Sequence, residues 1–68
     1  MAKVLKVIEV FSESSKSFED AIEKGVKSTS KSVRNVRSAY VNEMSTTVSD
    51  GKVDKYRVNL KITFSVDV

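Results

Sequence analysis

The chain has 68 residues, 40% of them apolar, and a formal net charge of +3. It contains no Cys and no His, which excludes disulfides, thiolate chemistry and zinc sites of the usual kind. One domain of this length, residues 1–68, buries only about 60% of its unfolded surface. Small domains need a disulfide, a metal or a partner chain for stability, so self-association is the predicted stabilising element.

The sequence predicts no targeting signal. No apolar run approaches the roughly 18 residues of a membrane span. The first ten residues, MAKVLKVIEV, carry a charge every few positions and predict a strand rather than a signal peptide. The missing cysteines are typical of a reducing compartment. We therefore expect a cytoplasmic protein without a membrane partner.

The N-terminal half predicts a strand and then a helix. Residues 2–11, AKVLKVIEVF, are rich in Val and Ile and predict the strand. Residues 12–17, SESSKS, predict a polar break, in which Ser17 and Asp20 have capping-box spacing with Asp in place of Glu. An apolar period of three and four then predicts an amphipathic helix over 15–33. Its apolar face consists of Phe18, Ala21, Ile22, Gly25, Val26, Thr29 and Val33.

The C-terminal half predicts a β-hairpin around Asp50-Gly51, because a type I′ turn needs positive φ at both central residues. A two-residue turn fixes the register. The predicted opposed pairs are Val48 with Val53, Val41 with Leu60, and Ala39 with Ile62.

Opposed residues share a face of the sheet, which sorts the hairpin into two sides. Ala39 and Val41 join Val58, Leu60 and Ile62 under the helix. The second side is predicted to carry Ser38, Tyr40, Asn42, Met44, Arg57, Asn59, Lys61 and Thr63. The fold class is thus α+β, with β-α-β-β order, a three-stranded antiparallel sheet and one helix on one face. One helix leaves the second face open, and its mixture of apolar, aromatic and basic groups suits a subunit interface, a ligand site, or both.

The sequence gives little support for catalysis, phosphate-loop binding or nucleic-acid binding. Without His or Cys no ordinary nucleophilic triad or dyad can form, and enzymatic activity is not expected. Gly25 and Gly51 form no phosphate-binding loop. The basic stripe Lys24, Lys27, Lys31 and Arg34 lacks interleaved aromatic residues, so a solvated helix face is favoured over nucleic-acid binding.

A cation would need oxygen ligands in a chain of this composition. The predicted register places Glu43 on the core side, opposite Val58, where a carboxylate needs a partner or an outlet to water. In a symmetric oligomer, copies of Glu43, Asp50 or Asp54 could converge on a cation such as calcium.

The whole stretch 2–66 resembles the dodecins. The resemblance rests on the element order, on KVIEV in the first strand, on AIEKGV in the helix and on the ending YRVNLKITF. It implies a hollow shell of twelve identical subunits that stores or buffers riboflavin or FMN as stacked pairs between subunits. Such a homododecamer would cover the open face.

The resemblance also implies site residues, at which this chain departs from the family pattern. Ser38 stands where flavin-binding dodecins have a Trp that stacks on the isoalloxazine ring. Arg57, after Tyr56, stands where they have a Gln that hydrogen-bonds the ring edge. Glu43 keeps the Glu of the family's E-x-R-G, whereas Ser45 replaces its Arg. These residues and Tyr40 are the predicted ligand-binding residues.

Two hypotheses therefore remain open from the sequence. In the first, the dodecin-like shell binds flavin. In the second, the pocket has lost flavin and holds a cation such as calcium or another small ligand, or the shell is only structural.

Overall fold

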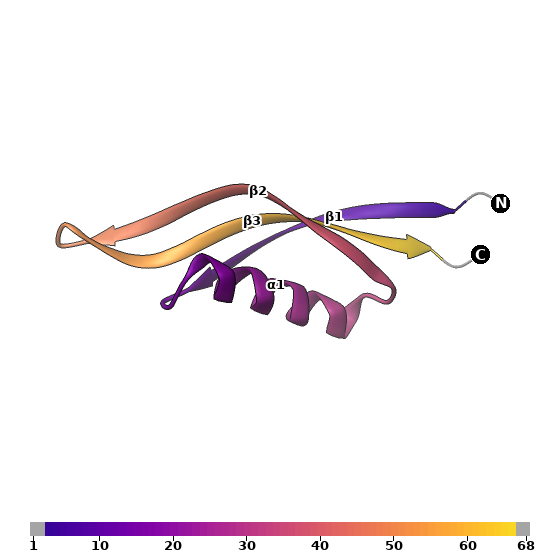
Figure 1. Ribbon diagram of the computed structural model, residues 1–68, viewed down its shortest axis with the longest axis horizontal. Helices are drawn as coiled ribbons and strands as arrows, with labels where there is room; N and C mark the ends of the chain where they lie inside the picture. The colour runs from indigo at the N-terminus through magenta and orange to yellow at the C-terminus, as the bar shows by residue number, and fades with distance from the viewer. Residues whose placement is uncertain (1–2, 67–68) are drawn as a thin grey trace.

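The computed structural model describes residues 3–66 and confirms the predicted element order. Strand β1 (Val4–Ser14) is followed by helix α1 (Phe18–Ser32), strand β2 (Val36–Ser49) and strand β3 (Lys52–Val66). The three strands form one antiparallel sheet in the order β1-β3-β2, so the C-terminal strand is central. Helix α1 lies across one face of this sheet, mainly over β1 and β3 (Figure 1).

The bounds of the first two elements differ from the prediction. Strand β1 continues to Ser14, because Ser12 and Ser14 pair with Val58 and Tyr56 on the central strand. Residue 2, the predicted first residue of this strand, lies outside the described residues. The helix begins at Phe18 rather than at residue 15 and ends one residue earlier than expected.

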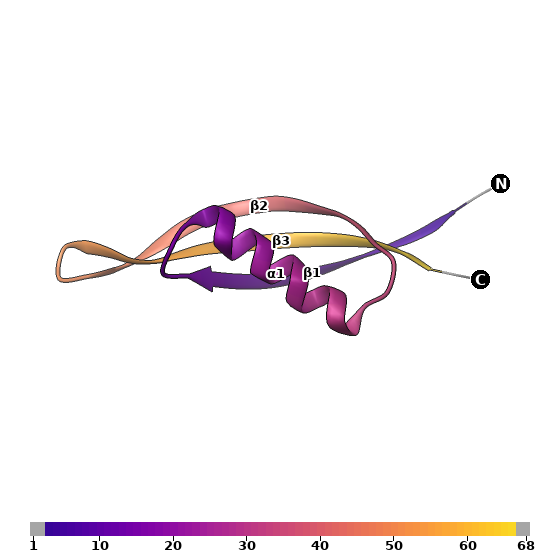
Figure 2. The same ribbon diagram turned by 60° about the horizontal axis from the view of Figure 1, so that its bottom comes forward.

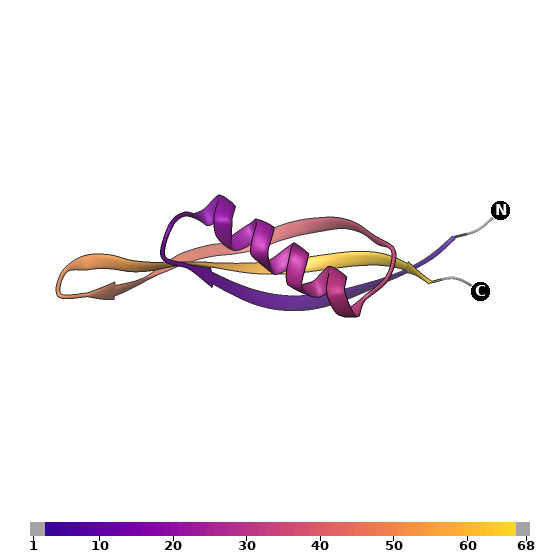
Figure 3. The same ribbon diagram turned by 90° about the horizontal axis from the view of Figure 1, so that it is seen from below.

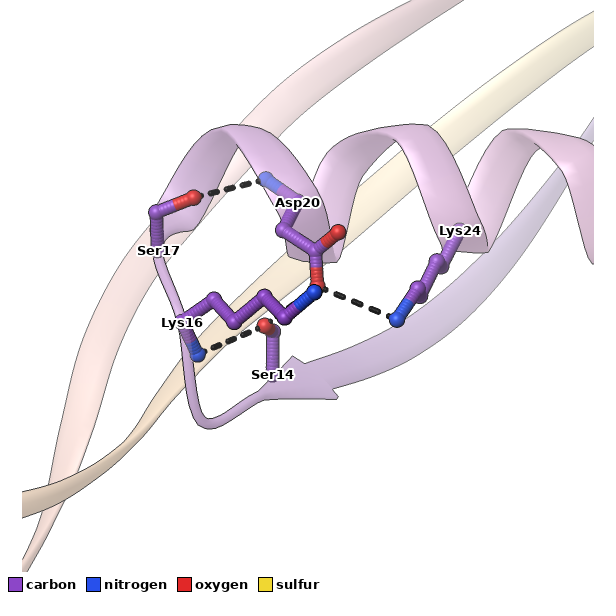
Figure 4. A network of polar contacts seen from close by, with 5 residues as sticks. All are labelled: Ser14, Lys16, Ser17, Asp20 and Lys24. Carbon is purple, nitrogen blue, oxygen red and sulfur yellow. Dashed lines mark hydrogen bonds and ion pairs between the residues drawn. The ribbon is translucent and has the colours of Figure 1, made fainter.

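The start of α1 is held by a polar network that joins it to the end of β1 (Figure 4). Ser17 is the N-cap, and its Oγ accepts a hydrogen bond from the backbone N of Asp20 at 3.0 Å. Ser14 Oγ donates to Asp20 Oδ2 at 2.6 Å, and Lys24 Nζ lies 3.3 Å from the same oxygen. The hydrogen bond from Ser14 is the largest cause that lowers the pKa of Asp20; partial burial opposes it, while Lys24 and Lys16 add to it.

The core lies between α1 and the central strand. Ala21, Val58, Leu60 and Ile62 are fully buried among the described residues. The helix approaches the sheet closely at Gly25, where an added Cβ would lie 2.8 Å from Leu60 Cδ1. A core this small agrees with the expectation that the chain needs a partner.

The hairpin turn is confirmed, because Asp50 and Gly51 have φ of 52° and 73°. All three predicted pairs across it are also confirmed: Val48 with Val53, Val41 with Leu60, and Ala39 with Ile62. Between these pairs, however, the register shifts twice. Asp54 is an extra residue in β3 and Asn42 an extra residue in β2, so the two bulges offset each other.

The molecule is long and thin, with principal extents of 53 × 19 × 13 Å. The turn end of the β2–β3 hairpin projects beyond α1 as an arm (Figures 1 and 2). Val48 and Val53 on this arm are exposed. An uncovered arm with apolar side chains is expected to pack against another molecule.

Candidate functional site

The sheet face opposite α1 is the candidate functional site, and we call it the open face. The helix lies entirely on the other side of the sheet (Figures 1 and 3). Along the central strand the open face carries Arg57, Asn59, Lys61, Thr63 and Ser65, and along β1 it carries Leu5, Val7, Glu9, Phe11 and Glu13. Exposed apolar side chains therefore alternate with charged ones across this face.

All five predicted ligand-binding residues lie on the open face, as their partners on the central strand show. Ser45 is opposite Arg57, and Glu43 is opposite Asn59. Tyr40 is opposite Lys61 and 65% exposed, and Ser38 is opposite Thr63.

The five residues do not form one pocket within a chain. Arg57 and Thr63, the partner of Ser38, are six residues apart on an extended strand, which is about 20 Å. Arg57, Ser45 and Glu43 lie together at one end of the face. Ser38 can meet them only in another copy of the chain.

The predicted position of Glu43 on the core side is wrong. The bulge at Asn42 moves Glu43 opposite Asn59 on the open face, where the carboxylate is exposed. For the same reason Met44 lies opposite Val58 and shares the helix side of the sheet, not the open face. Glu43 thus needs no buried partner and is available at the surface.

The bulge also brings Asn42 onto Asn59. Asn42 Nδ2 donates to Asn59 Oδ1 at 3.0 Å. Asn59 is only 3% exposed, and its Nδ2 is buried without a hydrogen-bond partner. A buried amide donor without an acceptor is unusual in a folded protein.

A hollow on the open face is lined by Phe11, Glu13 and Arg57. Arg57 Nε donates to Glu13 Oε2 at 2.7 Å, and Nη2 of the same guanidinium contacts the same oxygen. Phe11 is 70% exposed. Phe11 and Glu13 were not predicted from the sequence as site residues. A signal was present, because the first strand has apolar residues at both odd and even positions, which indicates that both of its faces are covered.

The described residues contain no group of three or more acidic side chains that could hold a metal ion within one chain. Over residues 3–66, no helix is both long and apolar enough to cross a membrane.

Comparison with known proteins identifies the family. The dodecin family model matches residues 4–67, and the chain belongs to the dodecin family. The structure of dodecin from Streptomyces davaonensis has a TM-score of 0.94 at 22% identity, with all of both chains covered. A Thermus thermophilus dodecin in which a tryptophan is replaced by phenylalanine has a TM-score of 0.92 at 27% identity, covering 98% of this chain and 100% of that one.

A third structure has a different described ligand. The calcium dodecin of Mycobacterium tuberculosis, described as a calcium-chelating immunodominant antigen with a novel calcium-binding site, is 34% identical. Its TM-score is 0.82, and the alignment covers 94% of this chain and 91% of that one. A comparison with curated protein sequences gave no match. Membership in the family, and the fold predicted from the resemblance, are thereby confirmed.

Proposed function

We propose that the chain is a non-enzymatic shell subunit that self-assembles into a homododecamer and binds a small ligand between subunits. The observation that carries the proposal is the open face, where Leu5, Val7, Phe11 and Tyr40 are exposed beside charged groups. Apolar side chains gathered on one face are expected to be covered by a partner, and ligand pockets form readily where such faces meet.

The size of the chain supports self-assembly independently. The fully buried apolar core found in the described residues is four side chains, in a molecule 53 Å long. A core of this size contributes little stability, so association is expected to supply the rest. The partner that fits best is another copy, because the family resemblance implies a shell of identical subunits.

Riboflavin or FMN is the ligand that we propose first, on the family resemblance. The residues at the family's contact positions weaken the case for a flavin. Ser38 offers no ring to stack on, and the side chain of Arg57 can donate hydrogen bonds but cannot accept them. Tyr40, Glu43 and Ser45 would line the same face. The chain has no Trp at any position, so stacking would have to use another aromatic residue.

Calcium is the second candidate, and the specific observation in its favour is the 34% identical calcium dodecin. The exposed position of Glu43 on the open face lets its carboxylate meet those of other copies. Asp50 and Asp54 at the hairpin tip are also exposed. Hard cations such as calcium take six to eight oxygen ligands, which several subunits could supply together.

The proposed partners are thus copies of the same chain and a small molecule, without nucleic acid or membrane. The proposed location is the cytoplasm, as expected from the cysteine-free sequence. Cell fractionation with an antibody against the native chain tests the location.

The ligand is tested by titrating riboflavin, FMN and Ca²⁺ into the purified, metal-free protein. Flavin binding is followed by quenching of flavin fluorescence, and Ca²⁺ binding by calorimetry. Quenching with saturation at micromolar protein supports the flavin proposal. Heat of binding with Ca²⁺ and no flavin quenching supports the second candidate. If neither titration gives a signal, the proposed binding of these ligands is wrong, which leaves another small ligand or a shell that is only structural.

A further inference from the structure

We propose that a groove between α1 and β1 binds a phosphate group, either as free phosphate or as a phosphate monoester. The groove has a volume of about 300 Å³ and is lined by residues 10–12 of β1 and by Lys24, Gly25, Ser28 and Thr29 of α1. It lies on the helix side of the sheet, away from the open face that other copies are proposed to cover. Each chain contains a whole groove, so this site goes beyond the proposed function and does not depend on it.

The hydroxyl of Thr29 borders the groove without a partner in the chain. Thr29 is only 8% exposed, yet its Oγ1 makes no hydrogen bond with any described residue. Hydroxyl groups inside helices commonly donate to a carbonyl oxygen about one turn earlier, as Ser32 Oγ does to the carbonyl of Thr29 at 3.3 Å. Because buried polar groups are nearly always hydrogen-bonded, we expect the Thr29 hydroxyl to find its partner outside the chain, in the groove that Thr29 lines.

Two more hydroxyls border the same groove. Gly25 lets α1 approach β1 closely, since an added Cβ would lie 3.1 Å from Ser12 Cβ and 3.4 Å from Ser12 Oγ. The Ser12 side chain therefore faces the helix. Ser28 lines the groove one residue before Thr29, and neither serine hydroxyl is hydrogen-bonded to a described residue. The groove thus has three hydroxyl donors from two elements of the fold.

Lys24 supplies a positive charge beside these hydroxyls. Its Nζ lies 3.3 Å from Asp20 Oδ2, and its side chain is 63% exposed. An ammonium group has three N–H donors, so the ion pair with Asp20 leaves two of them for another partner. Lys31 follows two turns later on the same stripe of the helix and adds to the positive potential. The residues that line the groove include no carboxylate.

A second hollow that shares Lys24 has a different charge. It is lined by Asp20, Glu23, Lys24, Val26 and Lys27, and its two carboxylates oppose the binding of an anion. In the groove, by contrast, every polar side chain can donate a hydrogen bond. Phosphate oxygens accept several such bonds, and bonds to a charged acceptor are stronger than bonds between neutral groups. A phosphate group therefore fits the groove better than a neutral ligand does.

The test is calorimetric titration of the purified protein with inorganic phosphate and, separately, with glycerol phosphate, at constant ionic strength in chloride. Wild type should bind phosphate saturably. Thr29→Val keeps the shape of the side chain without its hydroxyl, and should weaken binding about five- to tenfold. Lys24→Gln removes the charge at an exposed position, and should weaken binding by a similar factor.

Lys27→Gln and Ser30→Ala are the matched controls, because both residues are exposed on the same helix but do not line the groove. Lys27→Gln removes the same charge as Lys24→Gln, and should bind phosphate within about twofold of wild type. Ser30→Ala removes a hydroxyl and should leave the affinity unchanged. Light scattering and thermal unfolding of each variant separate lost binding from lost folding. If Thr29→Val does not fold, Lys24→Gln and Lys27→Gln still decide the outcome.

Three results would overturn the phosphate site. They are no saturable phosphate binding by wild type, wild-type affinity in Thr29→Val, and an equal loss for Lys27→Gln and Lys24→Gln, which would indicate general attraction to the basic stripe. Tighter binding of glycerol phosphate than of inorganic phosphate would support a monoester as the ligand, and the reverse order would support the free ion. The molar mass and the flavin and Ca²⁺ titrations report on the proposed function separately, so either proposal can fail while the other stands.

Discussion

Arg57 on the central strand donates a hydrogen bond from Nε to Glu13 Oε2 on β1, at 2.7 Å. The pair lies on the open face, and both side chains remain largely accessible, at 46% for Arg57 and 37% for Glu13. Exposed ion pairs of this kind add little to stability. We therefore expect this ion pair to contribute little to the free energy of unfolding.

A double-mutant cycle with Glu13→Gln and Arg57→Gln should give a coupling energy below about 1 kcal/mol in the free energy of unfolding. The measurement is urea unfolding of the four proteins at one protein concentration. A coupling of several kcal/mol would show that the pair is structural, against our account.

Gly25→Ala should lower the free energy of unfolding by about 1 kcal/mol. The gain in helix propensity is about 1 kcal/mol, but an added Cβ would lie 2.8 Å from Leu60 Cδ1 and 3.1 Å from Ser12 Cβ. Leu60 is fully buried, so its Cδ1 must shift within the core, and overpacking costs about 1–3 kcal/mol. The control is Ser30→Ala, at an exposed position of the same helix; a stabilised Gly25→Ala would refute the close packing.

Asn42→Ala should lower the free energy of unfolding by about 1–3 kcal/mol. Asn42 donates to Asn59 Oδ1, and its loss leaves both polar atoms of a buried amide without partners. Asn42→Asp should lower the free energy of unfolding by less than Asn42→Ala does. The introduced carboxylate can accept a hydrogen bond from Asn59 Nδ2 once the Asn59 amide turns by 180°. Equal losses for the two variants in urea unfolding would show that the amide pair is not responsible.

Ser14→Ala should make the protein less stable at neutral pH, by an amount that shrinks in acid. The pKa of Asp20 is lowered in the folded chain, chiefly by the hydrogen bond from Ser14. A lowered folded pKa stabilises the fold above the unfolded value, about 3.9 for Asp, and this contribution is lost as pH falls through the folded value.

The measurement compares the free energies of unfolding of wild type and Ser14→Ala from neutral pH down to pH 3, where the difference should narrow. It should not vanish, because Lys16 N also donates to Ser14 Oγ at every pH. Ser15→Ala, at an exposed neighbouring position, is the control and should show no such trend. A difference that is independent of pH would contradict the role of Asp20.

The hairpin shows how far the sequence could predict the fold. The turn at Asp50-Gly51 gave three correct pairs, because the bulges at Asn42 and Asp54 offset each other. Between the bulges the same reasoning put Glu43 on the wrong face. Alternation of apolar residues does not reveal a bulge, since an extra residue changes which side chains are opposed without changing their types.

The candidate site shows a different limit. Ser38, Tyr40 and Arg57 could be placed on the open face because the hairpin turn links their strands. The meeting of Glu13 with Arg57 depends on the register between β1 and β3, whose residues are 44 positions apart. No turn connects those strands directly, so only the folded chain shows the pairing.

The most direct test of the central claim is the molar mass of the purified protein by light scattering at low micromolar concentration. Our account holds that the open face is covered by further copies of the chain, and predicts a mass twelve times the 7.6 kDa of one chain. A monomer or dimer under these conditions would contradict the shell and the ligand site proposed within it.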